Sequence, residues 1–306
     1  MLDEPVTDTD PNPLLAAAWT HGPRGLIGLE GVPEALQEIA AMEPEDQEPP
    51  SAPVPEGDFG ASLGTVGGGN HFLELSEVEL VQDKALGRSA GLAPGGLAVL
   101  AHSGSRGLGH VLADRWPDGP LVGDALSTWL SELAGAVRYA RTNRLLLVWK
   151  GLRALGAARV SKVGGGFDVV HNTVVRAVVD HQDAWLHRKG CAPAAQGQLT
   201  VVLGSRGARS WVMEGAGSEA ALCSVAHGAG RKMTRSEAAA KVRAHHTRAA
   251  LVRTPLGGRV ICDDPALLYE EHPDAYKPIE PVIEALETHG AARRVLALRP
   301  ILTVKR

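Results

Sequence analysis

Histidines beside glycine-rich turns are the residues of this sequence best suited to chemistry. His71 follows three consecutive glycines in GTVGGGNHFLE, His102 ends an apolar run and begins HSGSRGLGH, and His171 ends the apolar run of FDVVHN. Neutral imidazole binds divalent Zn, Cu, Fe and Ni, with carboxylate or water added for Mn. The pattern indicates a metal site at these three histidines. The alternative for each is a histidine in a polar turn or in the core.

A fourth histidine lies in a setting suited to phosphate. His227 begins HGAGRKMTR, and a similar glycine turn, GSRGARS, follows the apolar run LTVVL. Glycines let backbone N–H groups approach an anion closely, and arginine binds phosphate oxygens. A histidine in such a setting can be a nucleophile or a general acid. No GxxxxGK[ST] is present, so this is not a P-loop protein, and no GxGxxG follows a strand, so a Rossmann dinucleotide site is unsupported.

Short β-branched runs between glycine turns predict the elements that position these residues. The expected strands are residues 97–102, 199–205, 258–262 and 294–305, and the expected helices are 33–41, around 124–148, 235–250 and 279–286. Pro300 predicts that the last strand lies at an edge or contains a bulge. Strands and helices do not alternate regularly, so we expect a compact mixed α/β (α+β) domain rather than a doubly wound sheet or a TIM barrel.

Charge divides the chain at residue 60. Of 306 residues, 44% are hydrophobic and 22% charged, with a net charge of −4. Residues 1–60 hold 13 acidic residues and one basic residue, a charge of −12, whereas residues 61–306 carry +8. Because 41–58 is rich in proline and acid, we predict that 1–60 is a partly disordered segment and 61–306 the catalytic domain.

The composition excludes a collagen-like, wholly disordered or coiled-coil chain. The apolar runs are too short to span a bilayer, and the acidic N-terminus does not resemble a secretory signal. The three cysteines, Cys191, Cys223 and Cys262, form no CxxC pair. These features predict a cytoplasmic protein with reduced thiols and no membrane partner.

The motifs taken together resemble those of a known family. GTVGGGNHFLEL, HSGSRGLG, HN, HRKG, GSRG, HGAGR, YEEHPDAYK and LRPILTVK follow one another over residues 60–306 in the order found in the RtcB RNA ligases. The variants GSRGARS, HGAGRK, GGRVICDD and RPILTVK look more like the branch associated with the release-factor homologue PrfH.

The resemblance implies a GTP-dependent, Mn²⁺-dependent ligase with an RtcB-like fold, acting in RNA repair or splicing. It would join RNA ending in a 3′-phosphate or 2′,3′-cyclic phosphate to RNA with a 5′-OH, through a guanylated His227 and an RNA-(3′)pp(5′)G intermediate. His71, His102 and His171 match the ligands of one or two Mn²⁺ ions. The positions that match nucleotide contacts are Asn70, Glu74, Asn172, Ser205, Ser210, Gly228, Gly230 and Lys305, together with His227 itself.

RNA contact is expected mainly through basic side chains. Only 4% of the residues are aromatic, so an extended base-stacking platform is not expected. Arg106, Arg188, Lys189 and Arg231 are the predicted RNA or phosphate contacts. The resemblance also leaves room for an activating protein partner.

One departure from the family pattern leaves alternatives open. The family has an upstream D-x-x-C-G sequence whose thiolate bridges two manganese ions, whereas the first cysteine here is Cys191. A misassigned start codon or truncated gene, a reduced metal site of three histidines plus water, or a paralogue that binds GTP or RNA without ligating would each explain it. A metal-dependent RNA-end phosphohydrolase is a further alternative function.

Overall fold

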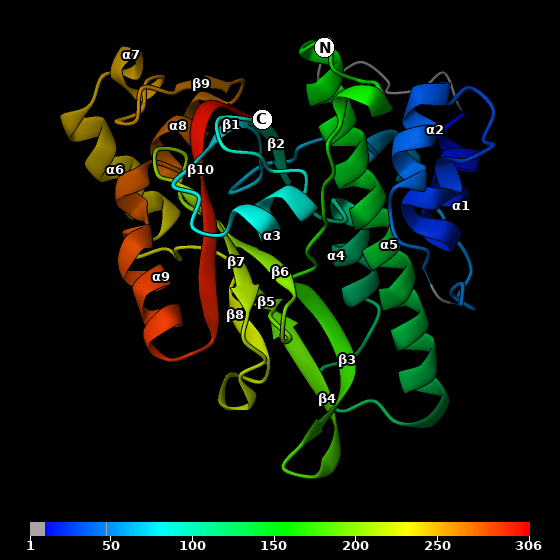
Figure 1. Ribbon diagram of the computed structural model, residues 1–306. Helices are drawn as coiled ribbons and strands as arrows, with labels where there is room; N and C mark the ends of the chain where they lie inside the picture. Colours follow the sequence, from blue (N-terminus) through cyan, green and yellow to red (C-terminus); the bar gives the residue numbers. More distant parts are fainter. Residues whose placement is uncertain (1–9, 47) are drawn as a thin grey trace. The chain divides into compact units, whose positions relative to one another are not determined.

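The computed structural model describes residues 10–46 and 48–306, and its contacts divide the chain into two compact units (Figure 1). The first unit comprises the residues up to Gly67 and Ala101–Gly164, and the second comprises Gly68–Leu100 and Gly165–Arg306. Helices accompany mainly antiparallel sheets, so the expected mixed α/β class is confirmed. The units do not follow the charge boundary at residue 60, and the assignment of 61–306 as the catalytic domain stays a prediction.

The first unit is helical. Its helices are α1 (Pro11–His21), α2 (Glu34–Ala41), α4 (Gly107–Ala113) and the long α5 (Gly123–Ala154), with short 3-10 turns at Gly22–Leu26, Gly60–Ser62 and Val160–Lys162. Trp19 of α1 and Tyr139 of α5 are buried in one apolar core. A Cβ at Gly135 would come within 2.3 Å of the Trp19 ring, so glycine lets α1 approach α5 closely.

The beginning of the chain has more structure than its composition predicts. Residues 11–41 contain α1 and α2, and the expected helix at 33–41 is confirmed as α2, preceded by Pro33. The acidic content conceals an apolar face on α1, formed by Leu14, Leu15, Ala18 and Trp19. Burying such a face outweighs the local composition. The part of this expectation that falls on residues 1–9 lies outside the described residues.

The acidic loop after α2 is held by α5. Asp46 accepts a hydrogen bond from Arg141 and lies 3.8 Å from Arg138, and Glu43 lies 3.4 Å from Arg141. The indole N–H of Trp19 donates to the carbonyl of Ala52 at 3.1 Å. The segment therefore forms a loop, as predicted, and its described part is fastened to the helical core.

A six-stranded sheet forms the centre of the second unit. Its strand order is β2-β1-β10-β7-β6, with β9 also paired to β10. The strands are β1 (Phe72–Glu79), β2 (Leu97–His102, whose last two residues are assigned to the first unit), β6 (Leu199–Val202), β7 (Ser210–Gly215), β9 (Arg259–Cys262) and β10 (Ala292–Lys305). The four strands expected from the sequence are all present, although β6 ends earlier than predicted.

Pro300 lies at a bulge in β10, one of its two predicted settings. The β1–β10 register passes from Leu75↔Leu302 to Ser76↔Pro300, so one residue of β10 is skipped. On the opposite edge, the β7 pairing ends at Leu298 and the parallel β9 pairing begins at Leu302. Proline has no backbone N–H, and Pro300 therefore lies where the hydrogen-bonded pairing is interrupted on both sides of β10. The edge-strand alternative was wrong, because β10 has partners on both sides.

The remaining elements of the second unit are two small sheets and several helices. β3 (Asn172–Val179) and β4 (Gln182–Lys189) form a hairpin, and β5 (Cys191–Pro193) pairs with β8 (Ser224–Ala226). The helices of this unit are α3 (Lys84–Ser89), α6 (Arg235–His245), α7 (Arg248–Leu251), α8 (Pro265–Glu270) and α9 (Ile279–Thr288), the last lying beside β10 in Figure 1. Among the residues that the structure describes, the helices are too short or too polar to cross a membrane.

Candidate functional site

His171 and His227 come together in the second unit. Their ring centroids are 4.5 Å apart, with the planes tilted by 31°. His171 immediately precedes β3 and His227 immediately follows β8, so two separate strand ends bring the rings to one place. The proximity of a predicted metal ligand to the predicted nucleophile is the first feature of a candidate site.

Gly190 is the junction that fixes this pair. Its N–H donates to the carbonyl of His171 and to the side-chain oxygen of Asn172, each at 2.9 Å. Its carbonyl accepts from the backbone N–H of His227 at 3.4 Å and contacts Nδ1 of the same ring. Gly190 has φ +68°, and a Cβ there would lie 3.3 Å from Cε1 of His227, so a side chain would be strained and would crowd the ring.

The Gly190 contact sets the tautomer of His227. A carbonyl oxygen only accepts hydrogen bonds, so the neutral ring carries its proton on Nδ1. The lone pair is then on Nε2. A neutral imidazole with a defined lone pair has the chemistry of a nucleophile or a base.

The loop after β6 fastens the other side of His227. The N–H of Leu203 donates to the carbonyl of His227, and the N–H of Ala229 donates to the carbonyl of Leu203, both at 2.9 Å. Within the loop, the N–H of Gly204 donates to the Ser210 hydroxyl at 3.2 Å. These bonds bring the GSRGARS and HGAGR segments together, including half-buried Ser205 and the glycines Gly228 and Gly230.

Arg206, which the sequence did not single out, has a structural role. Its side chain is buried and donates to the carbonyl of Leu268 at 2.7 Å, at the end of α8. Burial lowers its pKa to about 10. The buried arginine joins the GSRG turn to α8. An arginine in a glycine-rich turn has the same sequence pattern whether it binds a phosphate or a backbone carbonyl.

Glu74 and Lys305 are buried polar groups on paired strands. Both are 3% exposed. Glu74 accepts from the hydroxyls of Thr303 at 2.7 Å and Ser76 at 3.0 Å, and Lys305 donates to the carbonyl of His71 at 2.9 Å. Burial raises the pKa of Glu74 to about 7 and lowers that of Lys305 to about 8. Burial therefore disfavours the charged form of both of these predicted nucleotide contacts.

We expect Glu74→Gln to remove a pH dependence of stability. Folded Glu74 holds its proton up to a pKa of about 7, whereas a glutamate in an unfolded chain releases it near 4.5. Folding stability therefore falls as pH rises between these values. The variant should match the wild type at pH 4 and exceed it by roughly 3 kcal/mol at pH 8, since each unit of pKa difference corresponds to about 1.4 kcal/mol.

The measurement is urea unfolding of both proteins across this pH range. Exposed Glu284, replaced by glutamine, is the control and should keep the wild-type profile. Parallel profiles for the wild type and Glu74→Gln would contradict the prediction.

Arg231, a predicted phosphate contact, is bonded within the protein. It donates to Glu271 at 3.0 Å and to the carbonyls of Glu270 and Met233 at 2.9 and 3.0 Å. Glu271 is itself 2% exposed and accepts from Tyr276 and Arg235. This network holds the segment after His227 against the end of α8. A phosphate role for Arg231 stays a prediction.

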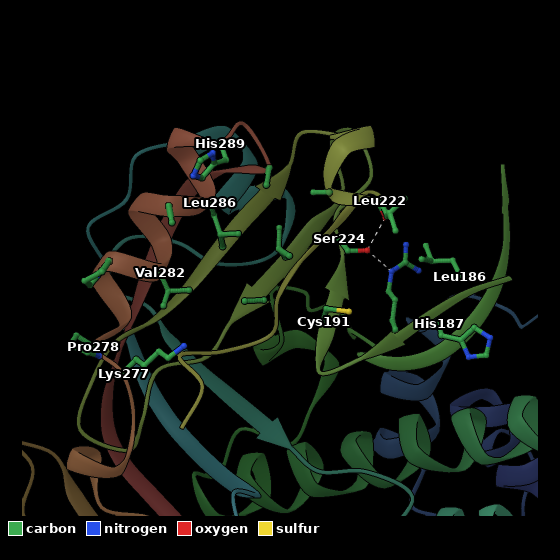
Figure 2. A pocket seen from close by; sticks show the side chains of 17 residues that line it. Leu186, His187, Cys191, Leu222, Ser224, Lys277, Pro278, Val282, Leu286 and His289 are labelled. Atoms are coloured by element: carbon green, nitrogen blue, oxygen red, sulfur yellow. Dashed lines mark hydrogen bonds between the residues drawn. The ribbon is translucent and has the colours of Figure 1, made fainter. Parts of the chain in front are cut away.

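Arg188 lies in the wall of a pocket of about 830 Å³. Figure 2 shows Leu186, Val282 and Leu286 among its apolar lining, and Arg188 donates to the Ser224 hydroxyl at 2.9 Å. Lys189, the next residue, is exposed at the end of β4. The RNA contacts predicted for both residues stay predictions.

In the first unit, His102 ends β2 and is 8% exposed. The loop that follows is fixed by Asn143 of α5, which is fully buried and donates to the Ser103 hydroxyl at 3.0 Å and to the carbonyl of Gly104 at 3.1 Å. Arg106 donates to Thr65 at 2.9 Å. Asn143 gave no sequence signal, since it lies inside a helix.

The other predicted residues lie at the ends of elements. Asn70 is exposed before β1, His71 is half-buried beside it, and Asn172 is exposed at the start of β3. His71 belongs to the second unit and His102 to the first. The three-histidine metal site stays a prediction, while the His171–His227 pair is present.

The protein thus has a mixed α/β fold and a pair of histidines that lies among glycine turns and is a candidate site for group transfer. The family described as tRNA-splicing ligase RtcB matches residues 34–121 and 119–306. The chain therefore belongs to the RtcB family, as the motif series implied.

Curated relatives agree with this assignment. The chain is 42% identical over 255 residues to the RNA-splicing ligase RtcB2 of Escherichia coli, covering 80% of this chain and 65% of the relative. It is 33% identical over 283 residues to the RNA-splicing ligase RtcB of Mycobacterium tuberculosis, covering 79% and 64%. It is 30% identical over 328 residues to the tRNA-splicing ligase RtcB of Pyrococcus furiosus, covering 91% and 33%. The chain thus spans just under two thirds of the first two relatives. The PrfH-associated branch stays a prediction.

Proposed function

We propose that this chain is a GTP- and Mn²⁺-dependent RNA ligase acting in RNA repair or splicing. It joins RNA ending in a 3′-phosphate or 2′,3′-cyclic phosphate to RNA with a 5′-OH. One observation carries the proposal: the His227 ring has its Nδ1 against the Gly190 carbonyl and lies 4.5 Å from the His171 ring. Family membership and the names of the relatives support the substrate class.

The chemistry follows from the tautomer. Nε2 of His227 attacks the α-phosphorus of GTP, a P–N bond forms, and pyrophosphate leaves. An oxygen of the RNA 3′-phosphate then attacks the same phosphorus, so that GMP passes to the RNA and the P–N bond breaks. The 5′-OH of the second RNA attacks the activated 3′-phosphorus, a phosphodiester forms, and GMP leaves. A cyclic phosphate end is first opened by water.

The donor atoms suit a divalent ion. His171 supplies imidazole beside the attacking group, and His71 and His102 offer the same ligand type. When bound, Mn²⁺ would offset the negative charge of the triphosphate. Lys305 and the glycine turns that contain Ser205, Ser210, Gly228 and Gly230 would bind phosphate and guanine groups. The Gly190 carbonyl keeps the proton of His227 on Nδ1.

The test is ligation of two synthetic RNAs, one ending in a 3′-phosphate and one beginning with a 5′-OH. We expect a joined product that requires both GTP and Mn²⁺. A strand with a 3′-OH is the control and should not be joined, because it has no phosphate to activate.

Two outcomes would overturn the proposal. Release of inorganic phosphate from the RNA end without GTP would identify a phosphohydrolase. Binding of GTP or RNA with no joined product under any divalent ion would identify a paralogue that does not ligate.

A further inference from the structure

Three potential metal ligands lie together at the ends of α6 and α8, outside the proposed catalytic site. The ligand atoms of His246, His272 and Asp274 all lie within 4.8 Å of one another. The two imidazole centroids are 4.8 Å apart. His246 directly follows α6, and His272 begins the 3-10 turn Pro273–Ala275. All three belong to the second unit.

Packing close to the three side chains holds together the two helices whose ends lie beside them. Val242, one turn before His246, is buried in a small core with Leu268 of α8. The backbone N–H of His246 still donates to the carbonyl of Val242 at 2.9 Å. Arg243 stacks over the Tyr269 ring at 4.5 Å. The two helix ends that present the ligands are therefore fixed to each other by apolar and cation–π contacts.

The hydrogen bonds make His272 an electron-pair donor. The backbone N–H of Asp274 donates to Nδ1 of His272 at 3.2 Å, so this nitrogen carries a lone pair rather than a proton. The Asp274 carboxylate oxygen lies 3.7 Å from the same nitrogen. The Asp274 carboxylate and Nδ1 of His272 are thus two electron-pair donors 3.7 Å apart, and a cation bound between them would replace the backbone N–H that Nδ1 accepts here.

The geometry points to a divalent transition-metal site formed by His246, His272 and Asp274, with Zn²⁺ as its resident ion. Two imidazoles and one carboxylate are a zinc-type ligand set with room for a water as fourth ligand. The ion would link the end of α6 to the turn before Tyr276. This site is independent of the His227 chemistry, and it would brace the segment that carries Glu271 and Tyr276.

The test counts ions bound by the full chain after removal of metal by a chelator. Co²⁺ is the probe, measured by equilibrium dialysis and by its visible absorption. We expect His246→Ala and Asp274→Asn to bind one ion fewer than the wild type, or to bind it at least ~10-fold more weakly, as loss of a ligand requires. His245→Ala, one residue away and also exposed, is the matched control and should keep the full count.

A second readout is stability. Zn²⁺ should raise the melting temperature of the wild type and of His245→Ala more than that of His246→Ala. Equal ion counts in the wild type and His246→Ala would overturn the proposal. Equal losses in His245→Ala and His246→Ala would also overturn it, because they would show binding by a histidine-rich surface rather than by this site. Neither result bears on RNA ligation.

Discussion

The His227→Ala variant is expected to form no covalent GMP adduct and to lose ligation by at least ~10³-fold, the order that follows removal of a covalent nucleophile. The reason is geometric. Gly190 fixes the proton of His227 on Nδ1, so Nε2 carries the lone pair and is the nitrogen proposed to attack. Alanine removes this atom and leaves the backbone bonds to Leu203 and Gly190 in place.

The measurement uses GTP labelled at the α-phosphate, with Mn²⁺, followed by a denaturing gel. The wild-type adduct should be labile to acid, as a P–N bond is. His289→Ala, at the exposed end of α9, is the control and should form the adduct normally. If the His227→Ala protein still formed a labelled GMP adduct, His227 would not be the nucleophile, whether or not RNA was joined.

The Asn143→Ala variant is expected to lower the free energy of unfolding by about 4 kcal/mol. The Asn143 oxygen accepts from the backbone N–H groups of Gly64 at 2.8 Å and Thr65 at 3.1 Å. Its amide group donates to Ser103 and Gly104. Alanine would leave buried donors and acceptors without partners, and each such group costs roughly 1–3 kcal/mol.

The measurement for Asn143 is urea unfolding of the full chain. Thr142→Ala is the matched control, since Thr142 is also fully buried but its hydroxyl donates only to the carbonyl of Arg138 within the same helix. We expect a loss of about 1 kcal/mol for this control. Similar losses for the two variants would contradict the role given to Asn143.

The sequence predicted the elements with strong local patterns. The β-branched runs at 97–102 and 258–262 and the helical spacing of Ile279, Val282, Ile283 and Leu286 are confirmed by β2, β9 and α9. Local patterns did not predict α1, whose acidic and proline-rich surroundings conceal its apolar face. They also did not predict the β3–β4 hairpin, whose turn places Asp180 and His181 at positive φ without the usual glycine.

The site was predicted from motifs, while its supports were not. The proximity of His171 and His227 agrees with the metal and nucleophile roles that the resemblance implies, and those roles stay predictions. Gly190 lay inside the quoted HRKG motif, but only the fold reveals that both its N–H and its carbonyl bind the histidine segments. Arg206 and Asn143 act through backbone carbonyls and N–H groups far away in sequence, and a pattern of residue types does not encode such partners.

The position of β10 has a consequence for folding during synthesis. Every other strand of the sheet precedes it in the chain, yet β10 pairs directly with β1, β7 and β9. Glu74 meets Thr303 across 229 residues. During synthesis on the ribosome the other strands emerge first, so the sheet lacks its central strand until β10 has been synthesised. The hydrogen bond from Thr303 to Glu74 is thus among the last to form, and Glu74 becomes buried only when the sheet is complete.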